Sequence, residues 1–314
     1  MSGALLGRSA IVTGASQGLG KAIAEAYVGA GANVCICARD AALLETVRRE
    51  LSEIAASGQR VAAVTADVSQ PEEVKALVES AEMTKHAINA FLATSVAFAN
   101  ELAILCEATG ADAKDVERGL KSESRIGPKA YLSPGAAFAG GTLARDLMFL
   151  TELGRRSNRP TPLLSAAGES NELHRQWAER RLQDELGDLQ GRRIAVWGLT
   201  YKPGTDTLRR SSAVQLCRRL TARGASIRAH DPVVRALPED LARDIELAPS
   251  AVEALADASA LVVATEWPEY RLVDPSEVVG AMRQPCVLDA GRFLAGSLGR
   301  DSRVRYVTVG RGTA

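Results

Sequence analysis

The chain has 314 residues, 46% of them hydrophobic, and its 38 lysine and arginine residues balance 38 aspartate and glutamate residues. This length exceeds one core of roughly 100 to 200 residues, so we expect two or three packed units. Zero net charge excludes a global field that would attract nucleic acid or an anionic membrane, so local groups must hold any anionic ligand. The five cysteines form no Cys-x-x-Cys pair, and their odd number argues against a complete disulfide framework. With no signal-like start and no 18-residue apolar segment, the sequence predicts a soluble cytoplasmic protein.

Residues 8–78 alternate β-branched runs with helical patterns. The runs are SAIVTG, ANVCICAR and RVAAVTADV, and the stretches between them have the apolar spacing of helices. This rhythm is typical of βαβ units on a parallel sheet. It predicts a first unit over residues 1–79.

A glycine-rich turn follows the first predicted strand and precedes a predicted helix. Glycines permit a tight turn and close approach of the backbone to a pyrophosphate, and the helix start supplies unpaired N–H groups. The pattern Thr-Gly-x-x-x-Gly-x-Gly resembles the short-chain dehydrogenase/reductases, and this resemblance implies dinucleotide binding. The residues that it assigns to the cofactor here are Thr13, Gly14, Ser16, Gly18, Leu19 and Gly20.

The ends of the second and third strands bear on the choice of cofactor. In the short-chain family a basic residue after the second strand pairs with a 2′-phosphate, whereas an acidic one binds the ribose hydroxyl. Arg39 favours NADP and the adjacent Asp40 keeps NAD open, so the cofactor is NAD or NADP. Asp67 and Val68 match the family's adenine-side pair, although Asp67 is equally consistent with an ordinary turn. The family's Tyr-x-x-x-Lys pair is absent, which excludes its reductase chemistry.

The region from about Ala81 to Thr109 is predicted to form one long, mostly apolar helix. Its sequence, with the segment up to Asp112, resembles the central helix of the UDP-glucose/GDP-mannose dehydrogenase family. Lys85 and Asn89 are four residues apart and therefore project from one helical face. The resemblance implies that they stabilise charge on the oxygen of the carbon being oxidised. It also implies a homodimer that forms through this helix.

Two loops continue the resemblance, although the second differs from the family's sequence. Arg125 lies in a match to the family's arginine loop, which reaches a sugar nucleotide across the dimer. The family's catalytic loop reads Gly-Gly-Ser-Cys-x-Pro-Lys-Asp, whereas residues 140–146 read Gly-Gly-Thr-Leu-Ala-Arg-Asp. Leu143 therefore replaces the cysteine whose thiolate carries the second oxidation, and the loop is one residue shorter. Asp146 keeps the position of an aspartate that assists water or the lysine.

Residues 190–314 return to βα alternation, with five strand-like runs that predict a second open α/β sheet. Several motifs resemble the family's UDP-binding domain. Lys202 after a strand and Arg209 before a helix are placed to neutralise a diphosphate, and Arg292 follows the fifth strand at the carboxyl edge. Arg210 replaces a glutamate that is usual in the family.

The predicted architecture is α/β: a Rossmann-like N-terminal half-domain, a central helical dimerisation region over residues 80–189, and a Rossmann-like C-terminal domain over residues 190–314. The resemblance implies oxidation at C6 of a UDP-hexose with NAD or NADP, and no nucleic-acid or membrane partner. The direct passage from Glu79 into the central helix omits the second half of the family's NAD domain. This omission and Leu143 keep open a sugar-nucleotide-binding protein without redox activity, and a one-step oxidoreductase that needs no cysteine.

Overall fold

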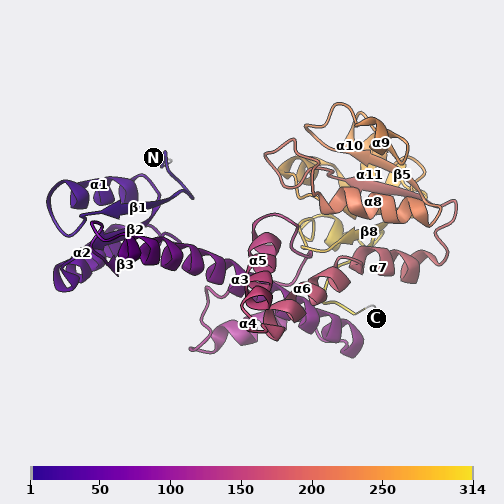
Figure 1. Ribbon diagram of the computed structural model, residues 1–314. Helices are drawn as coiled ribbons and strands as arrows, with labels where there is room; N and C mark the ends of the chain where they lie inside the picture. The colour runs from indigo at the N-terminus through magenta and orange to yellow at the C-terminus, as the bar shows by residue number, and fades with distance from the viewer. Residues whose placement is uncertain (1–2, 313–314) are drawn as a thin grey trace. The chain divides into compact units, whose positions relative to one another are not determined.

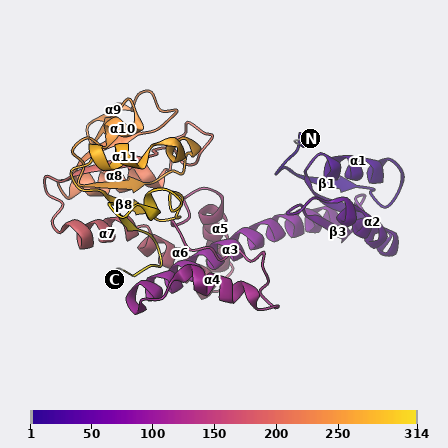
Figure 2. The same cartoon turned by 180° about the vertical axis from the view of Figure 1, so that it is seen from behind.

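The computed structural model describes residues 3–312 and divides into two compact units, residues 1–86 and 87–314 (Figures 1 and 2). The boundary lies inside a single helix, α3 (Pro71–Thr109). The predicted three-domain division at residues 79/80 and 189/190 stays a prediction.

The first unit is a three-stranded parallel sheet with the order β1-β2-β3. Its strands are β1 (Ser9–Thr13), β2 (Asn33–Ala38) and β3 (Val61–Thr65), at the positions of the three predicted runs. Helix α1 (Gly18–Gly29) packs its apolar face on β1 and β2, and helix α2 (Ala41–Ile54) packs on β2 and β3. This arrangement is one mononucleotide-binding half of a doubly wound fold.

Helix α3 begins at Pro71 rather than at about Ala81, because proline at a helix start needs no N–H partner and Glu72 and Glu73 follow it in the first turn. The helix contains an 18-residue window with a mean hydropathy of 1.5, of which 33% is buried. The prediction that no such apolar segment exists is therefore wrong. Length and composition alone would allow α3 to cross a membrane, but core helices of soluble proteins meet the same criterion.

In the second unit, α3 is followed by α4 (Ala113–Ser122), α5 (Thr142–Arg156), α6 (Pro162–His174) and α7 (Trp177–Leu186). Small residues of α3, including Ala90, Ala93 and Ala97, form an apolar cluster with residues of α5 and α6. Small side chains allow close approach of the helices, which positions the start of α5 against α3.

The C-terminal sheet has six parallel strands in the order β6-β5-β4-β7-β8-β9. They are β4 (Arg193–Trp197), β5 (Ser226–His230), β6 (Ile245–Leu247), β7 (Ala260–Val263), β8 (Cys286–Asp289) and β9 (Arg305–Val307). The connecting helices are α8 (Ser212–Ala222), α9 (Glu239–Ala242), α10 (Ala251–Ala254) and α11 (Pro275–Ala281), with 3₁₀ turns at Pro268–Leu272 and Leu298–Arg300. This is a doubly wound sheet, in which the chain changes direction between β4 and β7.

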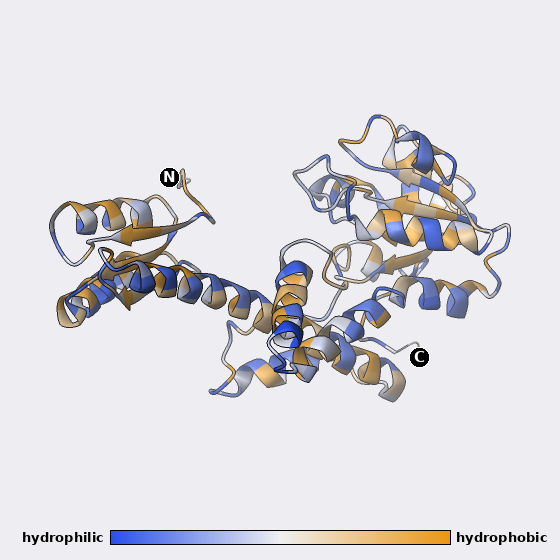
Figure 3. Cartoon of the chain, viewed as in Figure 1, coloured by the Kyte–Doolittle hydropathy of each residue, from blue (hydrophilic) through white to orange (hydrophobic). Residues whose placement is uncertain are grey.

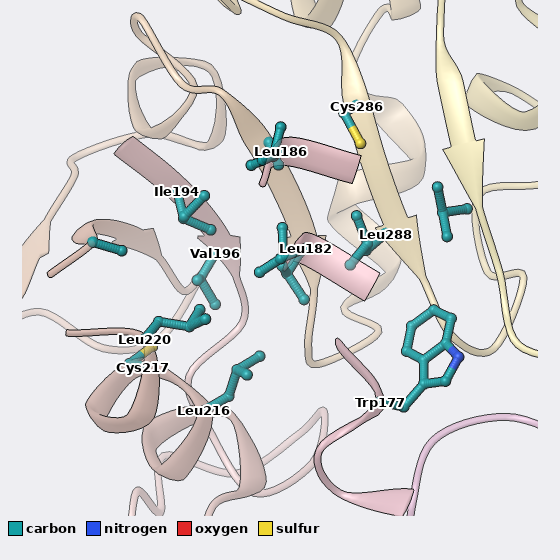
Figure 4. Packing of buried hydrophobic residues seen from close by; sticks show 14 of the residues in the cluster. Trp177, Leu182, Leu186, Ile194, Val196, Leu216, Cys217, Leu220, Cys286 and Leu288 are labelled. Atoms are coloured by element: carbon teal, nitrogen blue, oxygen red, sulfur yellow. The ribbon is translucent and has the colours of Figure 1, made fainter. Parts of the chain in front are cut away.

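Alternate residues of the strands face two apolar layers, as expected for a sheet covered on both sides. Ile194 and Val196 face the layer formed with α7 and α8, which Figure 4 shows around Leu182 and Leu216. Trp197 faces the opposite layer and stacks on Tyr270, with 4.7 Å between the ring centroids. In Figure 3 the strands are mostly orange, whereas the helices alternate between orange and blue segments.

Candidate functional site

The glycine-rich turn of the first unit has the backbone that a dinucleotide requires. Gly14 and Gly18 have φ values of 64° and 57°, which L side chains rarely adopt. A Cβ atom on Gly20 would lie 2.3 Å from the Gly14 carbonyl oxygen, so this position has no room for a side chain. Within the described chain, Gln17 gives α1 no side-chain cap, which leaves the N–H groups of the first turn for an anion. The turn therefore fits a pyrophosphate.

The charged residues predicted at the ends of β2 and β3 have different environments. The Asp40 carboxylate accepts a hydrogen bond of 3.0 Å from Leu43 N and caps α2. Arg39 is exposed. Hydrogen bonds from the backbone and hydroxyl of Ser69, together with the Arg39 charge, lower the pKa of Asp67. Both readings of Asp67 are therefore compatible with the structure, because its carboxylate orders a turn at the edge where the adenine side of a cofactor would lie. Val68 is exposed beside it.

In the second unit, α3 and α5 bring together two of the residues predicted to be catalytic. Asn89 Nδ2 donates a hydrogen bond of 2.5 Å to Asp146 Oδ2, and the Arg145 guanidinium lies 3.2 Å from Asp146 Oδ1. Asp146 is fully buried, whereas Arg145 is exposed. Lys85 is exposed one helical turn before Asn89 on α3. Asn89 and Asp146 are 57 residues apart in the sequence, and the fold brings them together as a polar pair at the start of α5.

The loop before α5 ties this pair to the C-terminal domain. A Cβ atom on Gly141 would lie 1.9 Å from the Tyr201 hydroxyl oxygen, and one on Gly135 would lie 3.6 Å from Gly291 Cα. Phe138 is fixed on both sides of its peptide, because Asn171 accepts from its N–H and donates to its carbonyl, each at 2.9 Å. The loop is therefore a defined turn between α5 and the C-terminal sheet.

A cavity of about 90 Å³ opens beside this loop at the carboxyl edge of β7 and β8. Its wall includes Ala136 of the loop, Ser212 at the start of α8, and Arg175 between α6 and α7. Among the described residues, the Ser212 hydroxyl is buried without a hydrogen-bond partner. The crevice at the carboxyl edge beside the topological switch point is where open α/β sheets bind ligands. Because the Ser211 side chain already caps the first turn of α8, the Ser212 hydroxyl and the Arg175 guanidinium are the groups here that suit an oxygen-rich anion.

The predicted cations occupy different environments. Lys202 and Arg209 are exposed on the loop before α8. The Arg292 guanidinium instead forms two hydrogen bonds with the Asp112 carboxylate, at 2.7 and 3.1 Å, and lowers the pKa of Asp112. Arg125 is 86% exposed and pairs with Glu123 in its own loop. The structure therefore leaves Lys202 and Arg209 accessible, whereas Arg292 would have to share or leave Asp112 to bind a diphosphate.

Sequence reasoning missed Tyr201, Arg175 and Ser212 as members of this site. Tyr201 and Ser212 lie inside segments that carry the family resemblance, but their importance depends on packing against the glycine loop and on burial. Arg210 adopts a left-handed backbone with φ of 60°, and its Cβ lies 4.0 Å from the Cβ position of Gly140. Strained backbone of this kind concentrates at functional sites.

The Gly140–Gly141 pair offers a sharp test of the loop. We expect Gly141→Ala to weaken UDP-glucose binding at least tenfold, because its methyl group would lie 1.9 Å from the Tyr201 hydroxyl oxygen and force the Tyr201 ring or the turn to move. Gly140→Ala is the matched control, since its methyl group would meet no atom closer than 4.0 Å. Titration calorimetry measures both affinities. Equal affinities of the two variants would contradict the close packing of Gly141 on Tyr201.

A glycine turn suited to a pyrophosphate and an open, doubly wound sheet with a crevice at its carboxyl edge are features of nucleotide-binding α/β proteins. The central-domain profile of the UDP-glucose/GDP-mannose dehydrogenase family matches residues 79–173, and its UDP-binding-domain profile matches residues 195–296. A short-chain dehydrogenase profile matches residues 8–109, beyond the predicted limit near residue 78. The chain belongs to the UDP-glucose/GDP-mannose dehydrogenase family through these two domains, joined to a short-chain-dehydrogenase-like N-terminal part.

Three curated relatives are UDP-glucose 6-dehydrogenases. The chain is 32% identical to UDP-glucose 6-dehydrogenase TuaD of Bacillus subtilis over 276 residues, which cover 86% of this chain and 59% of that protein. It is 36% identical to the Pseudomonas aeruginosa enzyme, with coverage of 74% and 52%. It is 37% identical to AglM of Haloferax volcanii, with coverage of 74% and 53%. The chain thus spans between 52% and 59% of the length of these three relatives. None of the three names supports the alternative of a protein that only binds.

Solved structures support the fold. A UDP-glucose dehydrogenase from Pyrobaculum islandicum has a TM-score of 0.62 at 24% identity, covering 94% of this chain and 75% of that one. An NDP-N-acetyl-D-galactosaminuronic acid dehydrogenase from Methanosarcina mazei has a TM-score of 0.64 at 20% identity, covering 93% and 73%. At these identities the likeness concerns the fold, and it agrees with the predicted Rossmann-like architecture.

Proposed function

We propose that this chain is an NAD(P)-dependent oxidoreductase that oxidises C6 of a UDP-hexose. The observation that carries the proposal is the hydrogen-bonded pair of half-buried Asn89 and buried Asp146, which lies at the end of the glycine loop whose other side packs on the UDP-binding domain. The three curated relatives, all UDP-glucose 6-dehydrogenases, support UDP-glucose as the first substrate to test.

The proposed roles follow from the chemistry of each side chain. Lys85 supplies a positive charge and Asn89 an amide donor, and both groups stabilise an oxygen that gains negative charge as the alcohol is oxidised. Asp146 orients Asn89 through its 2.5 Å hydrogen bond and holds water or a proton near that oxygen. A bound nicotinamide dinucleotide supplies the hydride acceptor. The glycine turn before α1 would hold its pyrophosphate.

The diphosphate of the substrate would be held at the carboxyl edge of the C-terminal sheet. Lys202 and Arg209 approach it from the exposed loop before α8, and the buried Ser212 hydroxyl gains the acceptor that it otherwise lacks among the described residues. Arg292 joins them only by exchanging part of its bond to Asp112 for phosphate oxygens. Arg125, exposed on its loop, would reach a sugar nucleotide held by a second copy of the chain.

A homodimer through α3 is part of the proposal. Phe91, Phe98 and Leu105 are 71%, 47% and 60% exposed and recur every seven residues, so they form one apolar stripe along α3. A second copy of the same helix would cover this stripe and also explain the apolar composition of α3. We place the protein in the cytoplasm, where its free cysteines stay reduced.

Calorimetric titration with UDP-glucose, NAD and NADP, followed by measurement of reduced cofactor at 340 nm, tests the function. Binding with cofactor reduction is the expected result. Binding of UDP-glucose without any reduction would reject the oxidoreductase and leave the sugar-nucleotide-binding alternative.

The contacts of Asp40 and Arg39 favour NADP over NAD. Because the Asp40 carboxylate caps α2, the exposed Arg39 is the side chain placed to meet a 2′-phosphate. We expect Arg39→Ala to weaken binding of 2′,5′-ADP about tenfold or more and to leave 5′-ADP nearly unchanged. These nucleotides probe only the adenosine half of the site. Arg60→Ala is the control, because Arg60 precedes β3 and therefore lies at the opposite edge of the sheet from Arg39. Equal losses for both nucleotides would contradict a role in 2′-phosphate recognition.

A further inference from the structure

We infer that this chain removes one hydride from its sugar substrate and releases a C6 aldehyde, instead of continuing to a carboxylate. The inference rests on the proposed function. In the single step, the C6–H bond breaks and its electron pair moves as hydride to the nicotinamide cofactor. The hydroxyl proton leaves to solvent, so that an alcohol and NAD(P)⁺ give an aldehyde, NAD(P)H and H⁺. The alcohol carbon is oxidised by two electrons and the cofactor is reduced by two.

A second oxidation needs an additional reactant at the aldehyde carbon. That carbon loses hydride readily only after a nucleophile has added to it and produced a tetrahedral centre bearing an O–H group. A thiolate is the side chain best suited to this addition near neutral pH, because a few per cent of an ordinary thiol is already ionised. The distribution of thiols therefore decides how far the oxidation can proceed by covalent catalysis.

The three cysteines of the second unit belong to an apolar cluster separate from the one that flanks the Asn89–Asp146 pair. Cys217 and Cys286 lie in the apolar layer beside α7 and α8, where burial raises the pKa of each to about 12. Cys106 belongs to the same layer, and burial raises the pKa of its thiol as well. Cys35 and Cys37 are on β2 of the first unit, and burial raises the pKa of both. Burial therefore disfavours the reactive thiolate at all five positions, and the three thiols of the second unit lie outside the apolar cluster at the start of α5.

The position that corresponds to the family's cysteine carries an inert side chain. Leu143 is in the first turn of α5, three residues before Asp146, and packs against the cluster of Ala90, Ala93 and Leu147. Its isobutyl group has no electron pair to donate. An alcohol such as that of the neighbouring Thr142 needs a general base to act as a nucleophile, and the buried Asp146 carboxylate is already engaged by Asn89 and Arg145. The geometry therefore retains the groups for one oxidation and omits a nucleophile for the next.

Stoichiometry tests the inference and separates it from the proposed function. The full chain is incubated with UDP-glucose and excess NADP or NAD in the presence of an O-alkyl hydroxylamine, and reduced cofactor is counted against UDP-glucose consumed. One equivalent, with the oxime of a UDP-sugar aldehyde found by mass spectrometry, is expected. Two equivalents with UDP-glucuronate would overturn the inference, because the aldehyde hydrate would then be oxidised without a thiol. No reduced cofactor would reject the proposed function itself.

A second measurement does not depend on turnover. Leu143→Cys places a thiol at the start of α5, and Met148→Cys places one at a position of the same helix that is 71% exposed. We expect saturating UDP-glucose to slow labelling of Leu143→Cys by a thiol reagent at least fivefold and to leave Met148→Cys unchanged. If UDP-glucose binds but protects neither cysteine, residue 143 does not face the sugar and the basis of the inference is removed.

Discussion

Replacement of Asp146 by alanine is expected to lower kcat for UDP-glucose oxidation by about 100-fold or more and also to destabilise the second unit by about 2 kcal/mol. The carboxylate is fully buried and accepts from Asn89 at 2.5 Å, so its removal leaves the amide without this acceptor and α5 without its polar link to α3. Initial rates of cofactor reduction measure the first effect. Urea unfolding measures the second.

Two variants separate chemistry from packing at this position. Asp146→Asn keeps the volume and can still meet Asn89 through its amide oxygen, so it should retain most of the stability while losing the negative charge. Asp115→Ala is the control for a surface aspartate, because this residue of α4 pairs only with exposed Arg118 and should change neither quantity appreciably. Wild-type turnover by Asp146→Ala would remove Asp146 from the proposed machinery.

The strands were predicted well where β-branched residues recur in one run. The three N-terminal runs became β1, β2 and β3, and the five C-terminal runs became β4, β5, β7, β8 and β9. The missed strand β6 has only the three residues Ile245–Leu247 and exists through its pairing with β5. A segment this short carries no periodic signal, so tertiary pairing rather than local preference determines it.

In the candidate site, too, some features could be predicted from the sequence, whereas others depend on tertiary packing. The resemblance assigned Asn89 and Asp146 to one site, and the structure brings them within hydrogen-bonding distance although 57 residues separate them; their catalytic roles stay predictions. It did not reveal that Arg292 binds Asp112, a contact between residues 180 positions apart that depends on how the central helices meet the C-terminal sheet. Nor did it indicate that Asp40 caps α2, since a cap is decided by backbone geometry rather than by residue type alone.

Asp231 carries the largest expected effect on stability. Its Oδ2 atom accepts hydrogen bonds from Leu199 N, Thr200 N and the Thr200 hydroxyl at 2.8 to 3.1 Å, and from the Trp267 indole at 3.2 Å. The residue is only 2% exposed, so Asp231→Ala would leave several buried donors without this acceptor. We expect a loss of about 4 kcal/mol or more in the free energy of unfolding, measured by urea denaturation. Asp240→Ala, which removes an exposed pair with Arg218, should cost less than about 1 kcal/mol.

The lowered pKa of Asp231 also predicts how the stability of the protein depends on pH. Burial acts to raise the pKa of Asp231, but the hydrogen bonds from Leu199, Thr200 and Val233 outweigh it and hold the pKa below the ordinary value of 3.8. Folding therefore favours the ionised form. Its contribution to stability is fully present above the unfolded-state pKa and is lost as the pH falls through the lower folded-state pKa.

The difference in unfolding free energy between wild type and Asp231→Asn should consequently be constant from pH 7 to about pH 5 and shrink towards pH 3. Other carboxylates titrate in both proteins, so the difference isolates Asp231. A difference that stays constant down to pH 3 would show that the charge of Asp231 contributes little. Because Asp231 fixes the backbone at Leu199 and Thr200, immediately before Tyr201 and Lys202, the variant should also bind UDP-glucose more weakly at neutral pH. Unchanged affinity in a destabilised but folded variant would separate the Asp231 network from the sugar-nucleotide site.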